Sequence, residues 1–209
     1  RVFTERLAEA TAVQLERWRA DGLDLPLSLN LSAKNLSESD LPERLLDVFG
    51  SHGISPRDLT LEVTETGLVE ETTGALELVR RLRALGFRLA LDDFGTGYSS
   101  LTYLRTLHAD VLKIDRSFVR QIIENTNDSR IVSSVIDMAH SLDMIVVAEG
   151  VETSEQWSRL IQLGCDRLQG FLFSQPVTAD ELLRAMRDHE GFLRSQTEVA
   201  LRRLPRPSL

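Results

Sequence analysis

Along the sequence, short apolar segments alternate with longer segments whose apolar residues have helical spacing. On this basis six strands are predicted, at residues 25–31, 59–64, 88–94, 111–115, 144–149 and 168–173. Helices are predicted at residues 1–22, 41–49, 72–85, 131–142 and 154–163. Because strands and helices alternate, we expect an α/β fold with a mostly parallel sheet.

Polar residues at the strand ends favour one α/β architecture over another. A (β/α)8 barrel places functional residues at the C-terminal ends of several strands, whereas an open doubly wound sheet gathers them near one switch point. The polar strand-end residues are Asn30, Glu62, Asp92, Asp93, Lys113, Asp115, Glu149 and Gln169. We therefore expect a TIM-like (β/α)8 barrel. A barrel needs eight strands, so we expect this chain to lack the first strands at its N-terminus.

Charge and cysteine content exclude several classes of protein. The 209 residues include 24 basic and 32 acidic side chains, and the formal net charge of −8 argues against a DNA or RNA polymer as partner. Cys165 is the single cysteine, so no disulfide within the chain and no cysteine-based zinc cluster can form. No apolar run reaches the roughly 18 residues of a membrane-spanning helix. We expect a cytoplasmic domain, whose parent protein could still carry a membrane anchor.

Four carboxylates, those of Glu62, Asp92, Asp93 and Glu149, lie in or directly after apolar strands. Close to a barrel core they would raise one another's pKa unless cations were present. Mg²⁺ and Mn²⁺ prefer oxygen ligands, and Asn30 would add a neutral oxygen from its own strand end. The alternative is that each carboxylate only caps a helix or faces solvent.

Residues 92–100, Asp-Asp-Phe-Gly-Thr-Gly-Tyr-Ser-Ser, join two adjacent aspartates to a glycine-containing loop. One aspartate could bridge two ions while the other binds one, and Ser99-Ser100 favour a helix N-terminus. A protein kinase also uses Asp-Phe-Gly, but this chain has neither a glycine-rich ATP loop nor a His-Arg-Asp loop.

Lys113 lies between Leu112 and Ile114 in a predicted strand, and a lysine there needs a partner or a function. It could orient an attacking water or stabilise developing phosphate charge, with Asp115 two residues on to orient it. A Schiff-base lysine and a buried ion pair without a catalytic function are the alternatives.

Gln169 and the aromatic residues after it could contact a ligand. The amide could hydrogen bond to a ligand edge and an aromatic such as Phe173 could stack on a base, although such aromatics more often belong to the core. The four histidines have no metal-pair spacing, so none is assigned to chemistry.

From about residue 1 to residue 188, these segments resemble the EAL-domain family, bacterial phosphodiesterases specific for cyclic di-GMP. The matching segments are 30–32 (Asn-Leu-Ser), 62–65 (Glu-Val-Thr-Glu), 92–100, 113–115 (Lys-Ile-Asp), 148–152 (Ala-Glu-Gly-Val-Glu) and 169–170 (Gln-Gly). The resemblance implies a TIM-like barrel that uses two divalent ions, Mg²⁺ or Mn²⁺, to hydrolyse cyclic di-GMP to linear pGpG. Residues 189–209 would form a C-terminal helix or tail.

The resemblance also implies site roles. Asn30, Glu62 and Asp92 would bind the first metal, and Asp92, Asp93 and Glu149 the second. The catalytic residues would be Lys113 at the attacking water, Asp115 beside it, Glu65 anchoring the loop after Asp93, and Glu152 in support. The substrate-binding residues would be Gln169, Asp93 and Phe173. Residues 94–100 resemble the family's lid and dimer-linked element, which implies a homodimer, and a GGDEF or sensor domain is a frequent neighbour.

One family feature is absent, because the chain contains no Glu-Ala-Leu motif and its only Glu-Ala, Glu9-Ala10, is followed by Thr11. The resemblance implies another ligand of the first metal at that glutamate, on a strand before Arg1. Two other functions stay open. One is a catalytically inactive cyclic di-GMP receptor. The other is an unrelated barrel lyase with Lys113 as Schiff base, which would leave the carboxylates unexplained.

Overall fold

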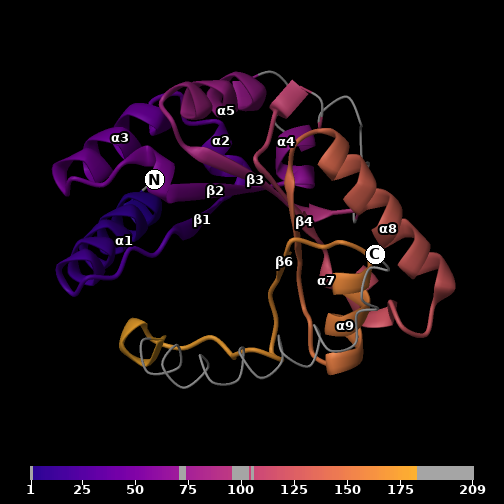
Figure 1. Ribbon diagram of the computed structural model, residues 1–209. Coiled ribbons are helices and arrows are strands. Elements are labelled where there is room, and N and C mark those ends of the chain that lie inside the picture. The colour runs from indigo at the N-terminus through magenta and orange to yellow at the C-terminus, as the bar shows by residue number, and fades with distance from the viewer. Residues whose placement is uncertain (1, 71–73, 96–103, 105, 183–209) are drawn as a thin grey trace, which may run out of the picture.

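The computed structural model describes residues 2–70, 74–95, 104 and 106–182. Within them the chain forms a curved, parallel, six-stranded sheet with the order β1-β2-β3-β4-β5-β6. The strands are β1 (Leu27–Leu31), β2 (Leu59–Thr64), β3 (Arg88–Phe94), β4 (Val111–Ile114), β5 (Ile145–Ala148) and β6 (Arg167–Leu168). Figure 1 shows helices covering the outer side of this sheet, while β1 and β6 form its two edges.

Helix α1 precedes β1, and the other described helices lie between consecutive strands, as the alternation predicts. The helices are α1 (Val2–Ala20), α2 (Ala33–Leu36), α3 (Leu41–Ser51), the 3-10 turn η1 (Pro56–Asp58), α4 (Glu65–Glu70), α5 (Gly74–Ala84), α7 (Arg116–Gln121), α8 (Thr126–Ser141) and α9 (Ser154–Gln162). Each predicted helix is confirmed, although α8 begins five residues before the predicted residue 131, and residues 1, 72 and 73 of the predicted helices lie outside the described part. The predicted helix start at Ser99-Ser100 also lies outside it. Helices α2, α4 and α7 were not predicted, because they are too short to show a helical period.

The last strand is the main error of the sequence analysis. Residues 168–173 are predicted as a strand, but β6 ends at Leu168. Leu172 N donates to Val151 O at 3.0 Å and Phe173 N donates to Gly170 O at 3.1 Å, so the chain turns back against the loop that follows β5. Gln169 therefore lies just beyond the strand rather than within it.

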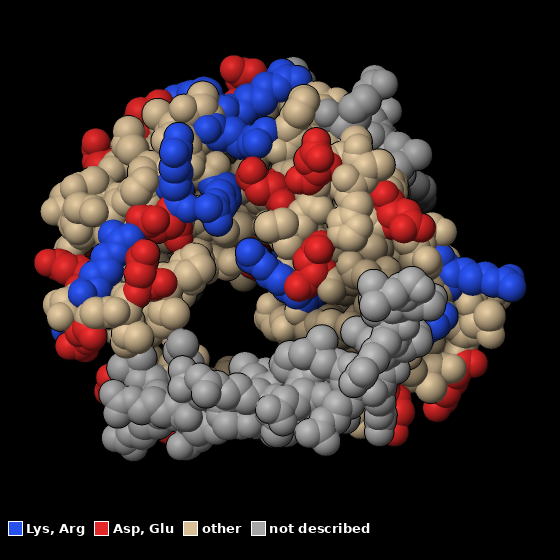
Figure 2. Space-filling view, in the orientation of Figure 1, with Lys and Arg blue, Asp and Glu red and all other residues tan. Residues whose placement is uncertain are grey.

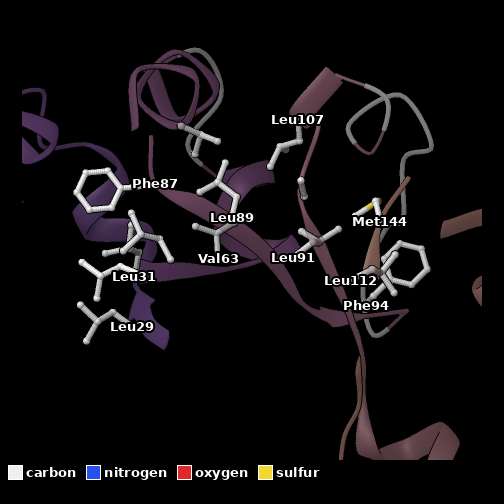
Figure 3. Packing of buried hydrophobic residues seen from close by; sticks show 14 of the residues in the cluster. Leu29, Leu31, Val63, Phe87, Leu89, Leu91, Phe94, Leu107, Leu112 and Met144 are labelled. Atoms are coloured by element: carbon white, nitrogen blue, oxygen red, sulfur yellow. The ribbon is translucent and has the colours of Figure 1, made fainter. Parts of the chain in front are cut away.

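The two faces of the sheet differ in burial. Leu59, Leu61 and Val63 of β2 face the helices and are completely buried, whereas the alternating Thr60, Glu62 and Thr64 on the other face are half-buried. Figure 3 shows the packing on the helix side, where the labelled core residues include Leu31, Val63, Leu89, Leu91 and Leu112. An apolar outer face and a partly polar inner face predict a concave site inside the curve of the sheet.

Three ties hold the N-terminal ends of the strands. In each, an arginine or histidine side chain at the end of a helix pairs with an aspartate that directly precedes a strand. That strand is the second one after the helix in the sequence. The pairs are Arg19–Asp58 at 2.6 Å, Arg83–Asp110 at 3.4 Å and His140–Asp166 at 2.9 Å. Asp110 also accepts a hydrogen bond from Leu89 N at 2.9 Å, and Asp166 accepts one from Val146 N at 2.7 Å. These bonds join neighbouring strands in pairs at the rim opposite their C-terminal ends.

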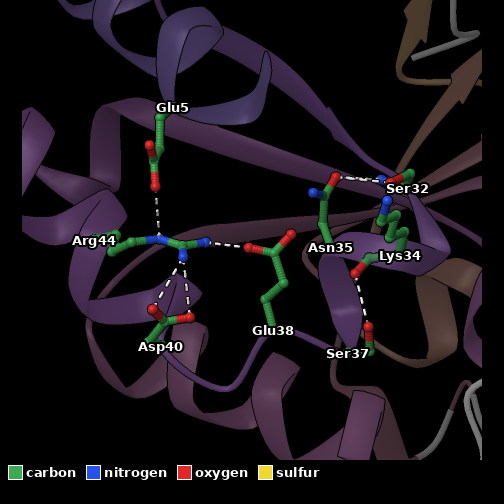
Figure 4. Close-up of polar contacts among 8 residues, drawn as sticks. All are labelled: Glu5, Ser32, Lys34, Asn35, Ser37, Glu38, Asp40 and Arg44. Atoms are coloured by element: carbon green, nitrogen blue, oxygen red, sulfur yellow. Dashed lines mark hydrogen bonds and ion pairs between the residues drawn. The ribbon is translucent and has the colours of Figure 1, made fainter. Parts of the chain in front are cut away.

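Arg44 of α3 joins the first helix to the body of the protein (Figure 4). Its guanidinium lies 3.0 Å from Asp40 and 3.5 Å from Glu5 of α1, and it also pairs with Glu38. Figure 4 shows as well the capping of α2, where Ser32 N donates to Asn35 Oδ1 at 3.0 Å. These contacts fix the segment that follows β1.

Among the described residues no helix combines the length and the apolar character needed to cross a membrane. On the outer surface, Arg81 of α5 pairs with Glu43 of α3.

His52, just after α3, lies between two carboxylates of α1. Its Nδ1 is 2.8 Å from Glu16 Oε2 and its Nε2 is 3.1 Å from Glu9 Oε1. These two hydrogen bonds, that of Glu16 first, raise the pKa of His52 above its ordinary value of 6.5. The folded chain therefore holds this proton more tightly than the unfolded chain does.

We predict that His52→Gln lowers stability at acidic pH and has a smaller effect at alkaline pH. A raised pKa in the folded state stabilises the fold below the unfolded value, and this contribution is lost as pH rises through the folded value. Thermal unfolding of both proteins across pH checks it. His108→Gln is the control, because that exposed ring contacts a backbone oxygen, Thr106 O, at 3.1 Å. A His52→Gln deficit that is independent of pH would refute the prediction.

Candidate metal centre

The candidate site lies where four neighbouring strands end on the concave side of the sheet. Parallel pairing places Glu62 of β2 beside Ala90 of β3, and Lys113 of β4 beside Val147 of β5. Asp92 of β3 and Glu149 after β5 follow two residues later on their strands, on the same face. Figure 2 shows the molecule hollowed where this concave side opens, with charged side chains along the wall.

Lys113 lies at the centre of the site. Its Nζ is 2.6 Å from Glu62 Oε2, 2.7 Å from Glu149 Oε1 and 3.1 Å from Asp92 Oδ1, and its side chain is 7% exposed. One ammonium group thus meets carboxylates from three other strands. The expectation that Lys113 has charged partners is confirmed, but those partners differ from the predicted Asp115.

Several carboxylates surround the single ammonium group of Lys113, and the pKa values of Lys113 and Glu149 are both raised. Burial opposes protonation of Lys113, but its hydrogen bonds to Glu149 and Glu62 outweigh burial and raise the pKa of Lys113. For Glu149, burial raises the pKa. The negative charges of Asp92 and Glu62 raise it further, while Lys113 lowers it. The site therefore holds excess negative charge that one lysine does not neutralise.

Asp93 completes a cluster that could hold a metal ion. One carboxylate oxygen from each of Asp92, Asp93 and Glu149 lies within 4.8 Å of the others. Asp93 has a positive φ of 55°, which turns its side chain away from the regular strand alternation, and its N–H donates to Asp92 Oδ1 at 3.0 Å. Burial and the charges of Asp92 and Asp115 raise the pKa of Asp93. Hard divalent cations would relieve this repulsion.

The other predicted site residues lie around this cluster at different depths. Asn30 is exposed on β1, in register with Glu62. Asp115 caps α7, because its Oδ1 accepts a hydrogen bond from Ser117 N at 2.9 Å, and its carboxylate forms no ion pair with Lys113. Glu65 is buried, 6% exposed, at the start of α4.

Three predicted residues sit beyond β5 and β6. Glu152 is exposed in the loop before α9, and its N–H donates to Gln156 Oε1 at 2.8 Å. Gln169 is exposed, with its backbone bonded on both sides, since Gln169 N donates to Ala148 O at 2.9 Å and Val151 N donates to Gln169 O at 3.0 Å. Phe173 is half-buried and packs against the core. Of the predicted loop 94–100, residues 96–100 lie outside the described part.

The contacts of α7 were not predicted from the sequence, although its first turn touches Gly95 and Gly150, which closely follow Asp93 and Glu149. A signal was present, because Gly95 and Gly150 follow those two acidic residues closely and mark tight backbone approaches. Only the structure shows what approaches them.

The EAL domain family model matches residues 2–176, so the chain belongs to the EAL domain family. Over 174 residues it is 38% identical to the bifunctional diguanylate cyclase/cyclic di-GMP phosphodiesterase MucR of Pseudomonas aeruginosa; the match covers 83% of this chain and 25% of MucR. The chain spans about a quarter of the length of the curated relatives it matches.

Solved structures agree with the family. The PaMucR phosphodiesterase in complex with c-di-GMP is 37% identical with a TM-score of 0.81, over 86% of this chain and 73% of that one. The manganese/cy-diGMP complex of Klebsiella pneumoniae BlrP1 at pH 9.0 is 33% identical with a TM-score of 0.75, over 84% of this chain and 45% of that one. The prediction of an α/β, TIM-like barrel is confirmed, with six strands in the described residues.

We predict that Lys113→Met destabilises the metal-free protein at neutral pH by about 3–5 kcal/mol, because it leaves buried carboxylates facing one another without a cation. The deficit should shrink at mildly acidic pH, since carboxylates with raised pKa values take up protons and lose their repulsion. Urea unfolding in the presence of EDTA measures both effects. Lys34→Met, at an exposed position of α2, is the control. Equal stability of Lys113→Met and wild type would contradict the prediction.

Proposed function

We propose that this protein hydrolyses cyclic di-GMP to linear pGpG with two divalent ions, Mg²⁺ or Mn²⁺, in bacterial second-messenger signalling. The observation that carries the proposal is the convergence of Glu62, Asp92, Asp93 and Glu149 around Lys113 at the C-terminal ends of parallel strands. Family membership and the relatives named as cyclic di-GMP phosphodiesterases support the substrate and the reaction class.

The residues present fit a pair of divalent cations. Four ionised carboxylates beside one ammonium group leave a net charge of −3, and burial already raises the pKa values of Asp93 and Glu149. All the donors are oxygens, the ligand type that Mg²⁺ and Mn²⁺ prefer. Asn30, exposed and in register with Glu62, would add a neutral oxygen.

We assign Asn30, Glu62 and Asp92 to one ion, and Asp92, Asp93 and Glu149 to the other. Bound there, the ions would lower the pKa of a water molecule and polarise the phosphate. The remaining residues position the reactants. Lys113 would orient the attacking water and place positive charge where phosphate charge develops. Gln169 and Phe173 would contact the substrate, while Glu65, Asp115 and Glu152 would support the loops.

The protonation of Lys113 argues against a Schiff-base lyase. A Schiff-base lysine must be neutral to attack a carbonyl carbon. Here the carboxylates raise the pKa of Lys113, so it stays charged at neutral pH. Phosphoryl chemistry uses a charged lysine directly, through electrostatic stabilisation.

The neighbouring domains are suggested by the names of two relatives, and the homodimer by the resemblance of residues 94–100 to the family's dimer-linked element. We propose a homodimer and a neighbouring GGDEF or sensor domain in a cytoplasmic setting. The name of MucR includes a diguanylate cyclase, and DosP of Escherichia coli is named an oxygen sensor protein; both are longer than this chain.

We predict that Glu62→Gln and Asp93→Asn each abolish Mn²⁺-dependent hydrolysis of cyclic di-GMP in the full-length protein, with a loss of at least about 100-fold, because each removes a charged metal ligand. Chromatography of the nucleotide products measures the loss. Glu155→Gln is the matched control, since that carboxylate is exposed on α9. Turnover at the wild-type rate in either variant would overturn the assignment of the metal ligands.

A second measurement, of binding, separates an enzyme from a receptor. Calorimetry with cyclic di-GMP, with and without Mg²⁺, measures binding independently of turnover. Tight binding without any linear product in the wild-type protein would replace the proposed enzyme with a cyclic di-GMP receptor.

A further inference from the structure

The first turn of α7, residues 116–118, lies between two loops, the one that follows Asp93 at the end of β3 and the one after β5 that contains Glu149. The helix starts directly after β4, the strand of Lys113. Asp115 fixes this start, because its side chain accepts a hydrogen bond from Ser117 N at 2.9 Å and its backbone oxygen accepts one from Phe118 N at 3.2 Å. The turn is thus anchored to the centre of the site.

On one side, this turn contacts the loop after β3. A Cβ atom placed on Gly95 would lie 2.7 Å from Cε2 and 3.0 Å from Cζ of Phe118, closer than real Cβ contacts. Gly95 has a φ of +97° and follows Asp93 by two residues. The Phe118 ring therefore lies directly against the backbone of Gly95, in the loop that follows the end of β3 with Asp92 and Asp93.

On the other side, the same turn contacts the loop after β5. A Cβ atom placed on Gly150 would lie 2.5 Å from Cβ and 3.4 Å from Cα of Arg116. Gly150 has a φ of +69° and directly follows Glu149, whose N–H donates to Ile114 O at 3.1 Å. Here the contact involves atoms near the helix backbone, which cannot move without the helix.

We propose that residues 116–118, the α7 wedge, set the spacing between Asp93 and Glu149 and so determine how tightly the site binds divalent cations. Arg116 and Phe118 act as positioning residues. The two glycines let both loops press against one rigid turn, so a displacement of the wedge moves ligands on both sides of the site. The inference rests on the proposed metal-dependent function and adds the element that shapes its metal site.

The energetics support a large effect from small shifts. Residues that orient metal ligands without touching the metal are worth about 10–100-fold in metal affinity. A Cβ on Gly150 would push against the helix itself, whereas a Cβ on Gly95 would push against a ring that can swing aside. We therefore expect Gly150→Ala to be the more damaging of the two substitutions.

The test measures Mn²⁺ affinity by calorimetry on the metal-free full-length protein, with circular dichroism to confirm folding. Gly164→Ala is the matched control, because Gly164 also has a positive φ, +86°, but no atom lies within 4 Å of its added Cβ. We expect Gly150→Ala to bind Mn²⁺ about 10–100-fold more weakly than this control. Gly95→Ala should lose less, and Gly95→Ala with Phe118→Leu should recover most of that loss, because leucine lacks the clashing ring atoms.

Mn²⁺ affinities of folded Gly95→Ala and Gly150→Ala equal to that of Gly164→Ala would overturn the inference, as would a failure of Phe118→Leu to restore Gly95→Ala. If Gly150→Ala does not fold, the Gly95 and Phe118 variants decide. Hydrolysis is measured separately. A wild-type protein that binds Mn²⁺ but releases no linear dinucleotide would refute the proposed function, and the affinities would still judge the α7 wedge.

Discussion

The balance of charge around Lys113 is the constraint on which the candidate site depends. Three carboxylates lie within 3.1 Å of one ammonium nitrogen that is largely shielded from water. Buried charges tolerate such crowding only when each has a partner. Lys113 supplies one positive charge and leaves an acidic surplus, and that surplus is what makes the place attractive to divalent cations.

The parallel sheet brings these groups together from distant parts of the sequence. Glu62 and Lys113 are 51 positions apart, yet their strands are separated only by β3. Each strand ends at the same rim, so a polar residue at each end is sufficient to build a site. In our proposal the α7 wedge sets the spacing between Asp93 and Glu149, because it contacts the glycines that closely follow both residues.

The sequence predicts the scaffold better than the fine geometry. The strands β1 to β5 follow from apolar runs bounded by turn residues, and the site follows from polar residues at their ends. The error at residues 168–173 arises because Leu172 and Phe173 look like a strand, although the chain turns to bond with Val151. The partner of Lys113 could not be predicted either. Asp115 is near in sequence, but the choice of partner depends on which strands lie side by side.

The N-terminal ends of the strands differ in their contacts from the C-terminal ends, where the candidate site lies. Three ion pairs lie at the N-terminal ends and are not part of the acidic cluster. They are Arg19–Asp58, Arg83–Asp110 and His140–Asp166. Because these ion pairs lie at the rim opposite the acidic cluster, a substitution among the acidic residues leaves them in place. A barrel built this way can lose an acidic ligand during evolution and still keep the sheet and the helices that cover it.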